Sequence, residues 1–156
     1  MKLRILAIGT RMPPWVDAGV AEFLKRFPRG FPVKLDAVAA ESRKAGGSGE
    51  ALREADSQRL RAQLRGGERV VVLDERGPAL TTRELAERVE AWQRDGRDVA
   101  LLIGGADGHS PGLRAQADEL MSLSALTLPH GIARLLLVEQ LYRAWSLSVG
   151  HPYHRE

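Results

Sequence analysis

The chain has 156 residues, of which 44% are hydrophobic, and carries 23 lysines and arginines against 20 aspartates and glutamates, a formal net charge of +3. This length fits one globular domain, which buries roughly 70% of the surface that the extended chain exposes. No cysteine is present, which excludes disulfides and thiolate metal sites and favours a cytoplasmic location. No apolar run approaches the roughly 20 residues of a membrane-spanning helix, and none resembles a secretory signal, so we expect neither insertion nor targeting.

The charge is unevenly distributed along the chain. Residues 1–44 hold nine basic and four acidic side chains, residues 45–129 hold eleven and fourteen, and residues 130–156 hold three and two. The basic ends are compatible with a nucleic-acid surface, and equally with an arginine-rich composition that has no functional meaning. The sequence leaves both interpretations open.

The first half of the chain predicts two strands and two helices. The apolar run 2–9 predicts a strand, and apolar residues at helical spacing over 15–27 predict a helix. Residues 31–40 alternate between apolar and polar side chains, which is typical of a second strand. The glycine-rich stretch 41–49 predicts a mobile loop, and a charged amphipathic helix is expected over 50–64.

The second half continues this alternation with three further strands and three further helices. Thr81 followed by Glu84 is typical of a capping box, and Ser110 followed by Pro111 is typical of an N-cap and a first helical residue. In chain order the sequence predicts a strand over 70–73, a helix over 81–94, a strand over 99–103, a short helix over 110–120, a strand over 123–128 and a helix over 132–147.

Strands that alternate with helices in this way indicate an α/β fold with a parallel sheet covered on both faces. Repeats and a domain linker are absent from the sequence, so we expect a single domain over 1–156. The last predicted helix, 132–147, has apolar residues on several faces. It forms either a homodimer interface or the centre of its own domain, and the pattern alone leaves both open.

Ligands of open parallel sheets bind at the carboxyl ends of the strands, here the loops after Leu73, Ile103 and Leu128. Gly104 and Gly105 would let the backbone approach a ligand closely, although such a pair is more often only a tight turn. No G-x-G-x-x-G sequence follows any strand, and no P-loop is present. These absences exclude an ordinary dinucleotide site, a Rossmann-type methyltransferase site and a P-loop nucleotide site.

Several segments together resemble one known family, the bacterial 23S ribosomal RNA pseudouridine N3-methyltransferases, which belong to the SPOUT or α/β-knot methyltransferases. The resemblance runs over 1–156 and is weakest over 41–60. The segments that carry it are AIGTRMPPWV at 7–16, DGRDVALLIGG at 95–105, LLIGGADGHSP at 101–111, SLSALTLPHGIARLLLVEQLYRAWS at 122–146 and HPYHRE at 151–156.

The resemblance implies a parallel-sheet SPOUT fold with a deep trefoil knot roughly over 70–150. It also implies that S-adenosylmethionine binds in a bent conformation within the knot, held by the backbone of three loops, and that two subunits of a homodimer form each site. The strand and loop at 123–128 would then surround the cofactor. Pro129 and His130 would redirect the chain into the last helix.

The resemblance also implies which residues contact the cofactor. Gly104 matches a position of the family's cofactor contacts, and Gly105 is added as its neighbour. We expect a bulky side chain at Gly104 to block the cofactor. Without the resemblance, Ser124 and Thr127 would be interpreted as residues that pack on a sheet. The expected set is Leu73, Gly104, Gly105, Leu123, Ser124, Ala125, Leu126, Thr127 and Leu128.

The implied reaction methylates N3 of pseudouridine 1915 in helix 69 of 23S ribosomal RNA, within the assembled 70S ribosome. The nitrogen must lose its proton while a neutral sulfide leaves unaided, so the chemistry needs positioning and at most one base. Side chains suited to these roles lie at the start of the last helix, within it and in the tail. The alternative interpretation of the tail residues is that they belong to a solvated chain terminus without a function. The titratable candidates are His130, Tyr153 and His154, none of them assigned as the base, and the candidate cations are Arg143 and Arg155.

The implied fold leaves no separate RNA-binding domain, so we expect the basic amino-terminal portion to contact phosphates, with no metal and no membrane involved. His109 is regarded as incidental. Two alternatives remain: a SPOUT enzyme with another RNA target, such as tRNA or a 2′-hydroxyl, and a non-enzymatic ribosome-binding factor on a degenerate knot fold. The candidate phosphate contacts are Lys2, Arg4, Arg11, Lys25, Arg26 and Arg29.

Overall fold

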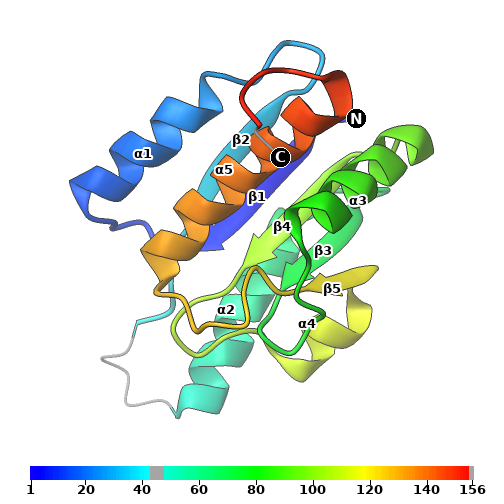
Figure 1. Cartoon of the computed structure of the whole chain (residues 1–156). Coiled ribbons are helices and arrows are strands. Elements are labelled where there is room, and N and C mark those ends of the chain that lie inside the picture. Colours follow the sequence, from blue (N-terminus) through cyan, green and yellow to red (C-terminus); the bar gives the residue numbers. More distant parts are fainter. Residues whose placement is uncertain (43–47, 155–156) are drawn as a thin grey trace.

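The computed structural model describes residues 1–42 and 48–154 as an α/β fold (Figure 1). The alternation of strands and helices expected from the sequence is confirmed. Most of the loop predicted to be mobile, residues 43–47, lies outside the described residues. In chain order the elements are β1 (Leu3–Ile8), α1 (Pro14–Leu24), β2 (Val33–Val38), α2 (Gly49–Gln63), β3 (Arg69–Leu73), α3 (Thr82–Asp95), β4 (Val99–Ile103), α4 (Pro111–Gln116), β5 (Glu119–Met121) and α5 (His130–Val149).

The described strands form one five-stranded sheet in the order β2-β1-β4-β3-β5, and every pair is parallel. Leu3 on β1 and Arg69 on β3 both align with Val99 on β4, so these three strands start level. Their carboxyl ends therefore meet at one edge of the sheet. In the sheet, β2 lies on one side of β1, whereas β4, β3 and β5 lie on the other. The direction in which successive strands are added therefore reverses beside β1 and β4.

Helices cover both faces of this sheet, as the sequence predicts (Figure 1). Helices α1, α3 and α5 pack on one face around Ile5, Val71 and Leu101, and α2 and α4 pack on the other around Leu6 and Val72. Because alternate residues of a central strand face two apolar layers, those strands are continuously hydrophobic. No helix among residues 1–42 and 48–154 is long and apolar enough to cross a bilayer.

Helix α5 lies between α1 and α3 on the sheet. Leu137, Val138, Leu141 and Ala144 have 0% exposed surface, so much of the apolar surface of this helix is covered within its own domain. Ile132, at the beginning of the helix, stays 37% exposed. The structure thus accounts for most of the unusual composition of α5 without a second subunit.

The fifth strand was predicted at 123–128, and that position is wrong: β5 is Glu119–Met121. The cause lies at Asp118, whose backbone N–H and carboxylate both hydrogen-bond to Val70 at the start of β3, so that α4 ends at Gln116 and pairing begins early. After β5, Ser122 and Ser124 make hydrogen bonds to nearby backbone, which take the place of a strand ladder.

Candidate active site

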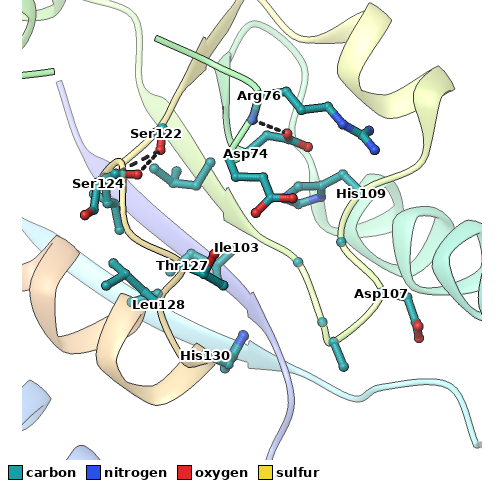
Figure 2. A pocket seen from close by; sticks show the side chains of 18 of the residues that line it. Asp74, Arg76, Ile103, Asp107, His109, Ser122, Ser124, Thr127, Leu128 and His130 are labelled. Carbon is teal, nitrogen blue, oxygen red and sulfur yellow. Dashed lines mark hydrogen bonds between the residues drawn. The ribbon is translucent and has the colours of Figure 1, made fainter. Parts of the chain in front are cut away.

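A cavity of about 370 Å³ opens at the carboxyl ends of β3, β4 and β5. Three loops that follow these strands form most of its wall, together with the first turn of α5 and side chains from α2 and α4. The cavity lies where the ends of parallel strands leave a crevice beside the reversal of strand order. Figure 2 shows the loops meeting around it.

Most of the predicted cofactor contacts line this cavity. Ala125 is the exception, since it does not belong to the wall. The others come from three places in the sequence that only the fold brings together. They are Leu73, Gly104, Gly105, Leu123, Ser124, Leu126, Thr127 and Leu128.

The backbone at Gly104 is tightly enclosed, but by protein. A β-carbon there would lie 3.0 Å from the carbonyl carbon of Gly108 and 3.2 Å from Cε1 of His109. Nine in ten real β-carbon contacts are looser than this, so a substitution requires the 104–109 loop to shift by a few tenths of an ångström. A side chain at Gly104 would thus act on the cavity by moving its wall, which differs from the direct block expected from the sequence.

The loop 122–128 holds its shape through serine side chains. The Ser122 hydroxyl donates to the Ser124 carbonyl over 2.8 Å, and the Leu126 N–H donates to the Ser124 hydroxyl over 2.9 Å. Leu126 is nevertheless 76% exposed. These hydrogen bonds fix a loop that presents leucine side chains and hydroxyl groups to the cavity, which suits a flat, partly apolar ligand.

His130 lines the cavity at the first turn of α5. Its Nε2 accepts a hydrogen bond of 2.9 Å from Nε of the buried Arg134, which also donates to the carbonyls of Ile8 and Gly9. Burial, and then the charge of Arg134, lower the pKa of His130, while a backbone hydrogen bond to Gly104 acts in the opposite direction. His130 is therefore neutral at pH 7 with one nitrogen occupied, so it is poorly placed to accept a proton.

Charged residues that the sequence analysis did not single out line the side of the cavity nearest α2 and α4. Asp74 directly follows β3, and the end of that strand was the one available signal for it. Arg53 and Arg114 lie on helices of the opposite face of the sheet, so no sequence pattern pointed to them. His109, regarded as incidental, also belongs to this wall and is only 3% exposed.

The predicted tail residues lie far from this cavity in the same subunit. The Tyr153 hydroxyl donates to Oε1 of Glu139 over 2.9 Å, and Arg143 contacts the same oxygen at 3.0 Å. Burial, followed by the bond to Glu139, raises the pKa of Tyr153. From His130 at the cavity to Glu139 and Arg143 the helix α5 rises by about 14 and 20 Å, at about 1.5 Å per residue. Neither Arg143, Tyr153 nor His154 lines the cavity, and Arg155 lies outside the described residues.

Part of the predicted phosphate-binding surface is corrected by the structure. Arg4 is buried at 7% exposure, and its guanidinium bonds Glu68 over 2.8 Å, because the residue lies within β1 and its side chain closes against α2. It is therefore unavailable to RNA. The other five predicted contacts are exposed residues: Lys2, Arg11, Lys25, Arg26 and Arg29.

The exposed basic residues are spread over the fold, because Lys2 and Arg11 lie at opposite ends of β1, and Arg11 and Lys25 lie at opposite ends of α1. Lys25 and Arg26 both pair with Glu22 at the end of α1, and the Arg26 guanidinium also lies 6.0 Å from the Tyr153 ring centre. This group therefore lies beside the tail, at the end of α5 opposite the cavity.

Among the described residues, no group of three or more histidines, aspartates and glutamates is arranged to hold a metal ion.

Comparison with known proteins identifies the family. The family described as "Predicted SPOUT methyltransferase" matches residues 1–154. The chain belongs to the SPOUT methyltransferases. It is 55% identical over 100% of both chains to "Ribosomal RNA large subunit methyltransferase H" of Methylibium petroleiphilum. Proteins of the same name from Leptothrix cholodnii and Burkholderia ambifaria are 54% and 52% identical, over 100% and 99% of each chain.

Membership in the SPOUT family implies a knotted fold for this chain. The path of the chain agrees with that expectation, because the segment after β5 crosses from the edge of the sheet past β3 and β4 to reach α5 beside β1 (Figure 1). SPOUT membership also agrees with a cavity whose wall is formed mostly by three loops. No G-x-G-x-x-G turn is needed when three loops converge on the ligand.

Proposed function

We propose that the protein is an S-adenosylmethionine-dependent methyltransferase of large-subunit ribosomal RNA that works in the cytoplasm. The identity of 55% over the full length to a relative of that name carries this proposal. The finer proposal is that it methylates N3 of pseudouridine 1915 in helix 69, in the assembled 70S ribosome. The family resemblance of the 122–146 segment and of the HPYHRE tail supports this choice over tRNA or a 2′-hydroxyl.

The residues of the cavity fit S-adenosylmethionine. Its volume of about 370 Å³ falls within the range of small-molecule sites, roughly 300–1,000 Å³. Leu73, Ile103 and Leu128 offer apolar walls for an adenine ring. Buried nitrogens of Arg53 and Arg114 that lack hydrogen-bond partners offer donors for the polar end. When bound, S-adenosylmethionine supplies an electrophilic methyl group on a sulfonium. The wall residues named here would hold it and exclude water.

We assign positioning to His130 and proton handling to the tail. His130 is neutral, and Arg134 occupies one of its nitrogens, so it suits orienting a ligand better than taking the N3 proton. His154, in the segment of the tail that carries the family resemblance, is our candidate base, because an imidazole can accept a proton. Tyr153 would stack on the target ring, and Arg143 and Arg155 would neutralise the developing negative oxygen or a phosphate.

These tail roles require a second subunit, because α5 separates the tail from the cavity of its own chain. Apolar side chains near the mouth of the cavity support a homodimer: Trp15 is 55% exposed, Leu126 76% and Ile132 37%. The beginnings of α1 and α5 are adjacent, since a β-carbon on Gly131 would lie 2.9 Å from Val16. A second copy seated there would cover these residues and bring its tail to the cavity.

RNA would then approach along the tail of the second subunit. Arg26 lies beside Tyr153 of the tail, and Lys25 and Arg29 are exposed close to it in the sequence, so the same dimer would place cations near the cavity of the other chain. Phosphate contacts of this kind make affinity fall steeply with salt. Ribosome binding that is indifferent to salt between about 50 and 200 mM would exclude this surface.

Calorimetric titration with S-adenosylmethionine separates an enzyme from a non-enzymatic ribosome-binding factor. The proposal requires that the parent protein bind S-adenosylmethionine saturably. The control variant Gly30→Ala should bind equally well, because its added β-carbon meets nothing within 4 Å. Absence of binding by a folded protein would favour the non-enzymatic alternative. Binding together with methylation of tRNA would favour the other SPOUT target.

A further inference from the structure

Charges of both signs line the side of the cavity away from Leu128 and His130. Arg53 comes from α2, Arg114 from α4, and Asp74 from the loop after β3. Figure 2 shows Asp74 beside His109, on the side of the cavity away from Leu128 and His130. The two sides of the cavity thus offer different chemistry.

Two of these side chains have donors that the described protein leaves unsatisfied. Nε of Arg53 and Nη1 of Arg114 are buried and have no hydrogen-bond partner among the described residues. Nη1 of Arg114 lies 3.6 Å from Oδ2 of Asp74, close enough for an ion pair but too far for a hydrogen bond. Buried charged donors without acceptors are costly. A ligand oxygen placed between the two guanidinium groups would satisfy both.

Three carboxylates line the cavity, those of Asp74, Glu75 and Asp107. Asp74 lies beside Arg114 and decides which kind of ligand fits between the arginines. The Asp74 side chain is only 8% exposed, so it would repel a phosphate, which carries negative charge alone. An α-amino acid group carries a carboxylate and an ammonium on adjacent atoms. Arginines next to an aspartate complement both of its charges.

We propose that Arg53 and Arg114 bind the carboxylate of the amino-acid end of S-adenosylmethionine, and that Asp74 binds its ammonium group. This inference rests on the proposed function, which supplies the cofactor. It adds three binding residues and an orientation: the adenosine lies against the 123–128 loop and the amino-acid end lies toward α2 and α4. The reacting sulfonium is then held from both sides.

The test uses two probes that differ in one carboxylate. S-adenosylhomocysteine has the full amino-acid end, and S-adenosyl-3-thiopropylamine lacks only the carboxylate. Calorimetry on the full chain compares both probes for the parent, Arg53→Gln, Arg114→Gln and the control Arg59→Gln. Arg59 lies on the same helix as Arg53 but pairs with Glu41 outside the cavity.

The inference predicts that each cavity variant weakens S-adenosylhomocysteine about tenfold or more, which corresponds to about 1.4 kcal/mol. Affinity for S-adenosyl-3-thiopropylamine should stay within about twofold of the parent value, and Arg59→Gln should match the parent for both probes. Circular dichroism checks folding. If the Arg114 variant fails to fold because Asp74 loses its partner, Arg53→Gln still decides, since no ion pair of Arg53 is present in the described structure.

Equal weakening of both probes, or no weakening, would overturn the inference. Unchanged probe affinity with weaker ribosome binding would assign the arginines to RNA phosphates and would also overturn it. Failure of the proposed function looks different, because the parent protein would then bind neither probe.

Discussion

The His109 ring is buried at the ends of β3 and β4, with 3% of its surface exposed. Burial lowers its pKa below the usual 6.5, and the charge of Asp74 and the carbonyls of Leu102 and Leu73 only partly offset this. Neither ring nitrogen has a well-aligned hydrogen-bond partner in the described structure. The folded state therefore holds this histidine neutral.

We expect His109 to make stability depend on pH. Because its folded pKa is depressed, the unfolded chain binds the proton more readily, and the free energy of unfolding should fall as pH drops below about 6.5. His109→Leu should lessen this fall, leaving the contribution of His130, whose pKa is depressed as well. Urea denaturation at pH 7.5 and pH 5.5 measures it. An unchanged pH dependence in the variant would mean that His109 is not held neutral.

Gly104→Ala tests how tightly the 104–109 loop is packed. Its β-carbon would meet Gly108 backbone at 3.0 Å, so we expect a loss of about 1–3 kcal/mol of stability together with weaker binding of S-adenosylhomocysteine. Gly30→Ala is the matched control, with open space around the new carbon. Thermal unfolding and calorimetry measure the two effects. Parental stability and affinity in Gly104→Ala would show that the loop yields freely.

Helix α3 begins with the capping box expected from the sequence. The Thr81 hydroxyl accepts from the Glu84 N–H over 3.1 Å, and the Glu84 carboxylate accepts from the Thr81 N–H over 2.7 Å. Thr81→Ala should lower the free energy of unfolding by about 1 kcal/mol, and Thr81→Ser should restore most of it. Urea denaturation of both variants measures this. Equal stability of the alanine and serine variants would show that the cap contributes nothing.

The elements that the sequence predicted well have local causes. The apolar runs of β1, β3 and β4, and the caps at Thr81 and Ser110, act within a few residues of the chain. The predicted position of the fifth strand was wrong because the true position depends on hydrogen bonds between Asp118 and Val70, which are 48 residues apart in the sequence. Ser122 and Ser124 alternate with leucines as in a strand, yet their hydroxyls bond local backbone instead.

The site was predictable only in part. The rule that ligands bind at strand ends indicated the loops after Leu73 and Ile103, and the family resemblance added residues 123–128, which form the loop after β5 instead of a strand. The fold brings these three segments to one cavity. Arg53 and Arg114 reach that cavity from the opposite face of the sheet, which follows from the strand order and not from any spacing. The tail could be placed only from the fold, which packs Tyr153 against Glu139 of α5 and away from the cavity wall.

A site shared by two subunits predicts complementation. Gly104→Val should impair the cofactor cavity, and the double variant Tyr153→Ala, His154→Ala should impair the tail, so each homodimer should be inactive. Mixing after exchange of subunits should restore about a quarter of parental activity, since half of the dimers then hold one intact site. Single-turnover methylation measures it. A mixture as inactive as its components would indicate that each site lies within one chain.

The central claim is that this protein methylates large-subunit ribosomal RNA. We would incubate it with methyl-labelled S-adenosylmethionine and ribosomes that lack the modification, comparing 70S particles, free 50S subunits and bulk tRNA, and map the label by mass spectrometry. The account predicts label on pseudouridine 1915 of helix 69 in 70S particles alone. Label on tRNA, or no label although the cofactor binds, would contradict it.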